Sequence, residues 1–351
     1  MQEMKRFILY FILWFLFLLP SFFFKIFEKK IDPIFFSYLD IIIISAFFAM
    51  IFSLLYWVVN LFIRFISFKK MSMVVIFCLS NIFIILNALV VIHISFFVVE
   101  MDFNALFIFH KLPKLGLLFF DNINVFFIFY IFIVNNFLLL LEYLVLFIGW
   151  KNFIASFLGG YYHPKNERKI FLFIDLKKST FYTENWTNYS FSLLMQECVL
   201  LLNRINDTYE GEIYRYLGDG MIIVWNIYDN QHEKNTYPYL LFYDFIQEIE
   251  NNKYFFIEHF SIVPQFKAVI HCGHAIKMIL GDTKKEISYF SDTLNTVAKM
   301  LDFAQESSVL LVSDYYKSII PKKNDVSCQF MKKVSLKGKE EQFILYRLYK
   351  K

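Results

Sequence analysis

The stretch RKIFLFIDLKKST, at residues 168–180, decides how the second half of this chain folds. Its apolar run has the length of a strand and ends in a single carboxylate, Asp175, which is followed by two lysines and by Ser179 and Thr180. A short continuous run of β-branched, leucine and aromatic residues is typical of a strand that is buried on both faces. We therefore expect a core strand that presents one acid at its carboxyl end.

The segments after this strand alternate between helical and strand patterns. An apolar face of helical length is followed by two β-rich arms around Gly218, Asp219 and Gly220, which predict a hairpin. The expected elements are a strand at 169–176, a helix at 189–209, the hairpin at 211–226, a helix at 237–252, two strands around Gly273 within 264–281, a strand at 285–290, a helix at 292–307, a strand at 308–314 and two arms around Gly338 within 334–348. Strand, helix, hairpin, helix and strand is the order of a ferredoxin-like sheet, so we predict an α+β domain of βαββαβ topology.

That topology brings two acids together. The first strand and the first arm of the hairpin are joined through a helix and therefore run parallel, so the end of the strand and the hairpin turn lie at one end of the sheet. Asp175 and Asp219, 44 residues apart, are predicted to be neighbours. Because two neighbouring carboxylates repel, three interpretations are open. They share a proton as an acid–base pair, they are solvated turn acids that never meet, or they hold divalent cations such as Mg²⁺.

Polar residues elsewhere in this half are of the types that a nucleotide phosphate site needs. Hydroxyls after the strand end, with backbone N–H groups that lead into a helix, can hold phosphates. An amide and a lysine four residues apart on one predicted helix share a face and suit charge that develops on phosphate and ribose oxygens. Lysines beside a predicted turn can reach phosphates as point charges. The hydroxyls are those of Ser179 and Thr180. The amide and lysine on one helix are Asn295 and Lys299, and the lysines beside the turn are Lys337 and Lys339.

The first half of the chain has a different composition. Of the 351 residues 58% are hydrophobic, and the excess lies in residues 1–150. Four apolar stretches are as long as the roughly 20 helical residues that cross a bilayer. They lie at about 7–27, 38–63, 73–99 and 123–148. We predict a transmembrane domain of four helices at 1–152, a linker at 153–168 and a cytoplasmic domain at 169–351.

The distribution of Lys and Arg favours a multi-pass protein of the inner cell membrane with both termini in the cytoplasm and the lipid bilayer as a partner. The ionisable residues within or near the spans are Asp40, His93 and Glu142. They are either functional groups or side chains that reach the interface or bond between helices. The asparagines that can bond between helices, and so favour a bundle or dimer, are Asn81, Asn87, Asn135 and Asn136.

Charge and cysteine spacing argue against two further classes. The net charge of +4 is small and the basic residues are scattered, so no nucleic-acid partner is expected. The four cysteines form no CxxC pair and no Cys/His set with zinc spacing, so we expect reduced thiols.

Four segments, in their order and spacing, resemble the catalytic domain of class III adenylate and guanylate cyclases: IFLFIDLKKST, EIYRYLGDGMIIVW, FKAVIHCG and ISYFSDTLNTVAKM. The resemblance covers about residues 168–348, and four spans followed by YYHPK look like membrane-bound bacterial adenylate cyclases of this class. It implies that Asp175 and Asp219 hold two Mg²⁺ or Mn²⁺ ions, and that ATP is converted to cyclic 3′,5′-AMP and pyrophosphate. It also implies a head-to-tail homodimer in which Asn295 and Lys299 come from the second subunit.

The resemblance also implies which residues read the base. The position three residues before Gly-Asp is usually Lys in adenylate cyclases and Glu in guanylate cyclases. Here it is Arg215, which only donates hydrogen bonds and so suits the N1 acceptor of adenine. The second base-reading position falls on Ser288, whose hydroxyl accepts from the adenine amino group but also serves guanine. ATP is the expected substrate and GTP the alternative.

Two residues depart from the family pattern. Lys299 stands where the family has Arg and cannot fork onto a phosphate, a loss that can lower the rate roughly a hundredfold or more. Ser291 stands where the family usually has Gly. Two outcomes are open, a slow cyclase or a catalytically weak membrane receptor that binds nucleotide without turnover. A third interpretation is a four-helix transporter or channel with an accessory domain.

Overall fold

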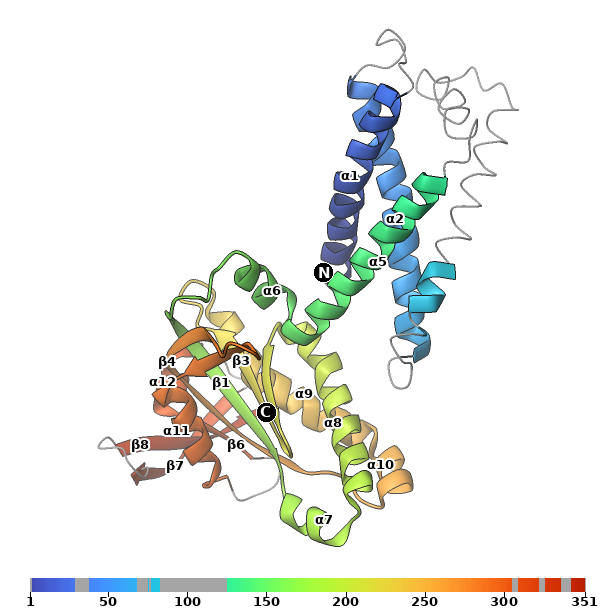
Figure 1. The fold of residues 1–351 in the computed structure, drawn as a ribbon. Coiled ribbons are helices and arrows are strands. Elements are labelled where there is room, and N and C mark those ends of the chain that lie inside the picture. Colours follow the sequence, from blue (N-terminus) through green and yellow to red (C-terminus); the bar gives the residue numbers. More distant parts are fainter. Residues whose placement is uncertain are drawn as a thin grey trace. The chain divides into compact units, whose positions relative to one another are not determined.

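The computed structural model describes residues 2–28, 38–67, 75, 77–82, 125–304, 309–321, 326–335 and 342–350. The chain divides into two compact units, Met1–Phe153 and Ile154–Lys351 (Figure 1). Long helices make up the described part of the first unit, and a β-sheet with flanking helices makes up the second.

Aromatic packing holds the first unit together. Its long helices are α1 Gln2–Glu28, α2 Tyr38–Ser67 and α5 Val125–Ile148, and the short helix α6 Trp150–Phe157 follows. The ring centroids of Tyr10 and Tyr56 lie 4.7 Å apart, and those of Trp14 and Phe52 lie 5.0 Å apart, which packs α1 on α2. The α5 residues in the same core are Ile131, Val134 and Leu138. Burial of these apolar surfaces stabilises the three-helix arrangement.

Glu142 bonds between helices in this unit. Its carboxylate accepts hydrogen bonds from the hydroxyls of Tyr10 on α1, at 2.8 Å, and Tyr56 on α2, at 3.3 Å. A carboxylate in an apolar core is costly unless such donors surround it. The sequence left open whether Glu142 is a functional group or bonds between helices, and the structure shows that it bonds between helices.

Asparagine side chains make a second polar contact between helices. Asn81 and Asn136 exchange hydrogen bonds of 2.9 and 3.1 Å, and Asn135 donates to Asn81 at 3.2 Å. The prediction that asparagines bond between helices is confirmed for these three. Asn87, His93 and the side chain of Asp40 lie outside the described residues.

The location predicted for the first unit is wrong. Helices α1 and α2 cover the predicted spans at 7–27 and 38–63, α5 covers 125–148, and most of 73–99 lies outside the described residues. Taken over the part of the chain that the structure describes, no helix has the length and apolarity that crossing a membrane demands. A crossing takes roughly 20 consecutive apolar residues in one helix. This finding contradicts the multi-pass inner-membrane location with cytoplasmic termini and leaves the lipid bilayer unsupported as a partner.

The second unit is built on an eight-stranded sheet of order β2-β3-β1-β4-β6-β8-β7, in which β5 pairs with β4. Strand β1 Lys165–Leu176 runs antiparallel to both neighbours, β3 Gly220–Asn226 and β4 Phe266–Leu280, and β2 Glu212–Leu217 pairs with β3. The order β2-β3-β1-β4 agrees with the predicted βαββαβ arrangement. Strand β1 lies inside the sheet because its middle is apolar on both faces, and Phe171 and Leu172 are fully buried.

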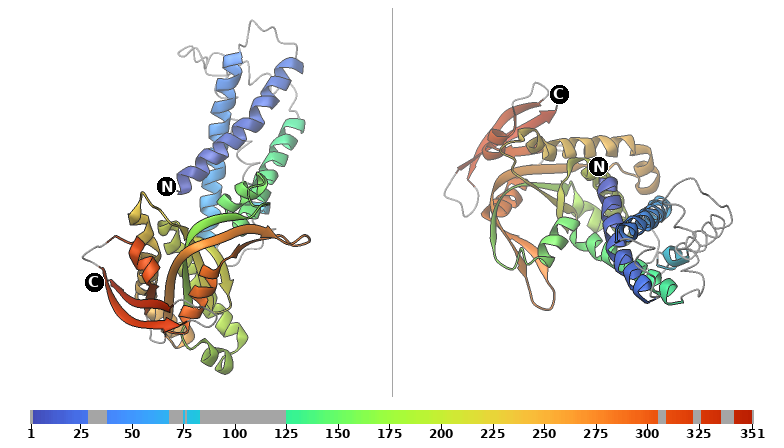
Figure 2. Two further views of the ribbon diagram at one scale, coloured as in Figure 1. Left: turned by 90° about the vertical axis from the view of Figure 1, so that its left-hand side faces the viewer. Right: turned by 90° about the horizontal axis from the view of Figure 1, so that it is seen from above.

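The remaining strands extend the sheet beyond β4. Strand β6 Leu310–Ser313 runs parallel to β4, and β8 Gln342–Lys350 and β7 Val326–Ser335 continue to the edge. Strand β5 Glu286–Phe290 pairs with the second half of β4. These two strands form a hairpin that projects from the body of the unit (Figure 2).

Helices cover both faces of the sheet. Helices α8 Asn188–Tyr209, α9 Tyr237–Asn251 and α10 Lys253–Phe260 pack on the face that receives Ile170 and Leu172 of β1. Helix α11 Asp292–Leu301 packs on the opposite face, where Val297 meets Phe171. The alternation of side chains along β1 therefore supplies both cores. The short helices of the unit are α7 Ser179–Asn185, η1 His232–Thr236 and α12 Asp314–Ile319.

Several element boundaries differ from the prediction, and β1 begins at Lys165 rather than at residue 169. Gly273 does not separate two strands but lies within the continuous strand β4, where a Cβ atom would come 2.5 Å from the Thr293 hydroxyl oxygen. The glycine is there because α11 approaches the sheet closely. Helix α11 ends at Leu301, shorter than the predicted 292–307, and β7 begins at Val326, earlier than the predicted arm at 334. Gly338 lies outside the described residues.

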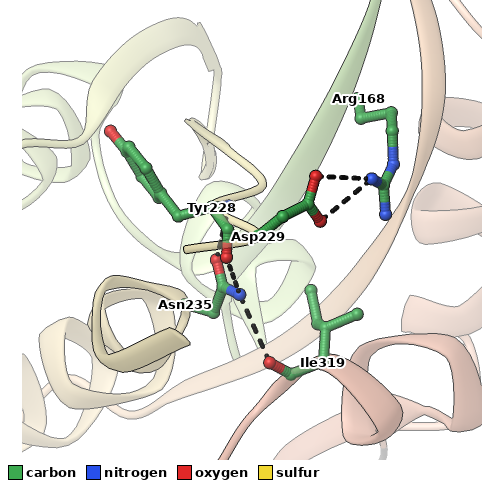
Figure 3. A network of polar contacts seen from close by, with 5 residues as sticks. All are labelled: Arg168, Tyr228, Asp229, Asn235 and Ile319. Carbon is green, nitrogen blue, oxygen red and sulfur yellow. Dashed lines mark hydrogen bonds and ion pairs between the residues drawn. The ribbon is translucent and has the colours of Figure 1, made fainter. Parts of the chain in front are cut away.

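A buried asparagine fastens the connection between β3 and α9 (Figure 3). The Asn235 side chain donates to the carbonyls of Tyr228, at 3.1 Å, and Ile319, at 3.2 Å, and accepts from the Tyr228 amide at 3.0 Å. Beside it, Arg168 donates to both carboxylate oxygens of Asp229 at 3.0 Å. These contacts tie the loop to β1 and to the end of α12. The four cysteines are free thiols, as predicted.

Candidate functional site

Asp175 and Asp219 lie together at the end of β1. Asp175 is opposite Gly220 in the register of β1 and β3, and the amide of Leu176 donates to the carbonyl of Asp219 at 3.1 Å. Burial, and then the charge of Asp219, raise the pKa of Asp175 above its ordinary value. The two acids therefore lie at the same end of β1, and the charge of Asp219 is the second cause of the raised pKa of Asp175.

The glycines of the hairpin turn explain why the acids fit there. Gly218 has φ +63°, a conformation that L side chains rarely adopt. At Gly220 a Cβ atom would lie 2.6 Å from the Phe173 ring and 3.4 Å from an Asp175 carboxylate oxygen. Glycine at this position keeps the space beside the Asp175 carboxylate open.

Lys267 is a third charged member that the sequence did not reveal. It lies opposite Asp175 in the register of β1 and β4, and its Nζ is 3.3 Å from Asp175 Oδ2. Both side chains are mostly buried, and Lys267 lowers the pKa of Asp175 against the larger opposing effect of burial. In the sequence Lys267 is only one of several polar residues in this strand, which also carries His271, His274 and Lys277. The register that places it beside Asp175 is a tertiary property.

The acid pair fits divalent cations. Carboxylate oxygens are hard ligands, and Mg²⁺ is commonly bound by one or two carboxylates together with water and substrate phosphates. A cation also relieves the mutual repulsion that raises the pKa of Asp175. Among the described residues no group of three or more His, Cys, Asp and Glu side chains assembles, so the remaining ligands would have to come from substrate or water.

Arg215 and Ser288 come together from β2 and β5. The Arg215 guanidinium donates to Ser288 Oγ at 3.3 Å, and it also forms an ion pair with Glu286. The guanidinium carbon lies 5.0 Å from the centre of the Tyr214 ring. A register shift between Ile213 and Arg215 in the pairing with β3 leaves Tyr214 without a partner in that strand. Sequence reasoning missed Glu286, because only the strand pairing brings β5 beside β2.

The candidate phosphate residues are placed in part. Ser179 and Thr180 open α7 after Lys178, which has φ 60°, and Thr180 is exposed. They follow Asp175 closely in the chain and so remain at the same end of β1. Lys337 and Lys339 lie outside the described residues.

Asn295 and Lys299 lie on helix α11. Helix α11 is fastened to β4 by the hydroxyls of Ser291 and Thr293, which donate to the carbonyl of His274 at 2.7 and 2.9 Å. Asn295 is exposed, and no described contact joins it to Asp175.

Ser291, which stands where the family usually has Gly, caps the N-terminus of helix α11. Its hydroxyl accepts from the amide of Leu294 at 3.4 Å, so Ser291 is the N-cap of α11. Serine is among the preferred N-cap residues because its oxygen satisfies a free amide of the first turn. The departure from Gly is thus explained by helix capping.

Comparisons with known proteins match the second unit of the chain. The family described as "Adenylate and Guanylate cyclase catalytic domain" matches residues 161–349. The chain is 30% identical over 180 residues to Adenylate cyclase 2 of Rhizobium meliloti (strain 1021), which is 50% of this chain and 48% of that protein. The chain therefore spans about half the length of this curated relative.

Solved structures that the chain matches include the adenylyl cyclase CyaB from P. aeruginosa, with a TM-score of 0.49 and 14% identity over 54% of this chain and 97% of that one. The guanylate cyclase domain of RhGC from Catenaria anguillulae in complex with GTP has a TM-score of 0.47 and 16% identity, over 53% of this chain and 98% of that one. Because the family match runs from just before β1 into β8 and takes in more than half of the chain, this protein belongs to the adenylate and guanylate cyclase catalytic domain family.

Proposed function

We propose that this protein is an adenylate cyclase, a lyase that converts ATP to cyclic 3′,5′-AMP and pyrophosphate. The observation that carries the proposal is the mutually repelling pair Asp175 and Asp219 at the end of β1, within a segment of this family. In the reaction the ribose 3′ oxygen forms a bond to the α-phosphorus. The bond from that phosphorus to the bridging oxygen breaks, pyrophosphate leaves with the oxygen, and the hydroxyl proton passes to water.

Asp175 and Asp219 would hold the Mg²⁺ or Mn²⁺ ions of the reaction. Such ions neutralise phosphate charge and make a bound hydroxyl more acidic. The fit rests on the burial of Asp175 and on its repulsion by Asp219. Once its carboxylate is neutralised in this way, the Lys267 ammonium, 3.3 Å away, becomes available for an anionic phosphate oxygen.

Arg215, Glu286 and Ser288 would read the base. Arg215 donates to the N1 acceptor of adenine, and the carboxylate of Glu286 and the hydroxyl of Ser288 accept from its 6-amino group. The same Arg215–Glu286 pair favours a second candidate, a guanylate cyclase. Arginine can donate to the guanine carbonyl while the glutamate accepts from the guanine N1–H and amino group.

Asn295 and Lys299 would act from a second copy of the chain. They lie on α11, a different element from the strands that carry Asp175 and Lys267, which fits a homodimer in which each site takes its acids from one protomer and this helix from its partner. The amide and the ammonium would then stabilise charge on the ribose and phosphate oxygens. Lysine in place of arginine at 299 supports low activity, and at the limit a domain that binds nucleotide without turnover.

An assay of the full-length protein with ATP and GTP in parallel tests the proposal. We expect cyclic AMP and pyrophosphate with Mg²⁺ or Mn²⁺, and loss of both products in Asp175→Asn. Asp282→Asn, which changes an exposed acid outside the site, is the matched control and should retain the activity. Cyclic GMP as the main product would favour the guanylate alternative. Nucleotide binding without either product would reject the cyclase proposal and favour a nucleotide-binding receptor.

A further inference from the structure

Lys277 is a fully buried cation that the proposed reaction does not use. It lies on β4, and its Nζ is 2.8 Å from Glu212 Oε1 on β2. The rings of Tyr161 and Tyr289 lie over the ammonium group, with centroids at 4.9 and 5.0 Å. Burial lowers the pKa of Lys277, and Glu212 opposes that effect. A charged group in such a place is stable only while its partners stay in position.

Tyr161 belongs to the segment that joins α6 to β1. It is 4% exposed, and its carbonyl accepts from the Ile279 amide of β4 at 3.0 Å. The turn before it is tight, because the Gly160 amide donates to the Ala155 carbonyl at 2.6 Å and a Cβ atom at Gly160 would lie 2.8 Å from the same oxygen. The segment is therefore docked on β4, with the Tyr161 ring as the cover of Lys277.

Glu212 connects this buried cation to the base-reading strand. It begins β2, the strand that carries Arg215, and β2 lies at the edge of the sheet, where only β3 pairs with it. The ion pair with Lys277 is thus a second attachment of β2, made across the sheet to β4. Tyr289 strengthens the link, because its amide donates to the Tyr214 hydroxyl at 3.2 Å, next to Arg215.

A second buried lysine belongs to the same cluster. Lys169 of β1 is 2.7 Å from Glu167 Oε2 and donates to Asn226 Oδ1 at 2.6 Å. Its Nζ lies 5.8 Å from the Tyr289 ring centre. Two lysines and two glutamates are therefore enclosed around one aromatic ring, so a displaced partner affects the whole group rather than a single pair.

We propose that Lys277 is a positioning residue that couples the docked segment around Tyr161 to the base-reading strand. While the Tyr161 ring covers the ammonium, the Lys277–Glu212 pair holds β2, and with it Arg215, in its register. When the ring leaves, water reaches Lys277, the pair weakens, and the edge strand loosens. The consequence for Arg215 rests on the proposed function, whereas the coupling of the segment to β2 does not.

Hydrogen exchange of the full-length protein tests the coupling. We expect amides of β2, residues 212–217, to exchange about tenfold faster in Tyr161→Leu and in Lys277→Met, because each removes a contact of a buried charge. Tyr161→Phe is the matched control, since it keeps the ring face over the ammonium and should exchange like the unmodified protein. Residues 342–350 of β8 report on global unfolding and should keep their exchange rate.

Two results would overturn the inference. One is unchanged exchange at 212–217 in both Tyr161→Leu and Lys277→Met. The other is an equal increase at 342–350, which would mean general destabilisation. Where turnover is measurable, Tyr161→Leu should change the ratio of kcat/KM for ATP and GTP about fivefold or more, as expected for a shifted base contact. If the unmodified protein forms no cyclic product, the proposed function is wrong. The hydrogen-exchange result then still decides whether the segment around Tyr161 is coupled to β2.

Discussion

Asp175 is subject to opposing influences. Burial and the charge of Asp219 raise its pKa, and Lys267 lowers it by less. Because the pKa is raised in the folded chain, the folded state binds the proton more tightly than the unfolded state. The stability that Asp175 contributes is therefore fully present at low pH and is lost as the pH rises through the raised pKa. A divalent cation that binds the ionised pair should restore stability near neutral pH.

Asp219→Asn should lower the pKa of Asp175 toward its ordinary value. The substitution removes the second-largest cause of the shift and leaves Lys267 in place. Carboxyl-carbon NMR titration of the metal-free protein measures it directly. Asp282→Asn, an exposed acid, should leave the titration unchanged. If the pKa of Asp175 is unchanged in Asp219→Asn, the two acids do not interact.

Helix α11 depends on its first turn for its place on the sheet. Ser291 caps the helix and also donates to the carbonyl of His274. Thr293 makes a second bond to that carbonyl, and Gly273 leaves room for it. The Ser291 cap and the space left by Gly273 fix helix α11 on the sheet, and with it the positions of Asn295 and Lys299.

Ser291→Ala should destabilise the second unit by about 1 kcal/mol, the usual effect of losing an N-cap side chain. Ser291→Gly, the residue usual in the family, should restore part of the loss, because glycine is tolerated at this position. Urea unfolding followed by far-ultraviolet circular dichroism measures the difference. Ser192→Ala, within α8, is the control and should have a smaller effect. Equal stability of Ser291→Ala and the unmodified protein would exclude the capping role.

The connection between β3 and α9 should also depend on one side chain, that of Asn235. Asn235→Ala removes three hydrogen bonds to partly buried backbone groups of Tyr228 and Ile319. We expect a loss of about 2–4 kcal/mol in the free energy of unfolding. Asn251→Ala, whose side chain bonds only at the surface, should change stability by less than about 0.5 kcal/mol. A loss as small as that of the surface variant would mean that the loop is held by other contacts.

At the scale of the whole molecule, one chain presents a divided set of site residues. The acids and Lys267 gather at the end of β1, Arg215 gathers with Glu286 and Ser288, and Asn295 and Lys299 lie on α11. In the proposed homodimer, each site would combine the acids of one protomer with α11 of its partner.

Mixing two inactive variants tests the division. Asp175→Asn lacks an acid of one half-site, and Asn295→Ala lacks the amide of the other. If sites are shared, a mixed dimer has one intact site, so the mixture should regain activity up to about a quarter of that of the unmodified protein. The measurement is cyclic nucleotide formation by co-expressed, purified chains. No recovery, with dimers present by sedimentation, would show that each chain completes its own site.

Site positions that follow from chain order could be predicted from the sequence, whereas those that depend on strand pairing and register could not. Asp175 and Asp219 were predictable as neighbours because chain order and the parallel direction of two strands suffice to bring their ends together. Lys267 and Glu286 were not, because their neighbours depend on which strand pairs with which and in what register. A shift by one residue would turn Lys267 to the other face. The membrane location rested on the length of the apolar stretches and on the distribution of Lys and Arg, and the described helices contradict it.

By itself the sequence determined the α+β class, the strand that ends in Asp175 and the glycine-flanked turn that carries Asp219, since periodicity and turn chemistry are local properties of the chain. Tertiary structure alone decided that Lys267 opposes Asp175, that Glu286 holds Arg215 and that Lys277 is sealed between Tyr161 and Tyr289. The physical reason is that burial and charge pairing depend on neighbours distant in sequence. Those neighbours exist only once the strands have paired in register.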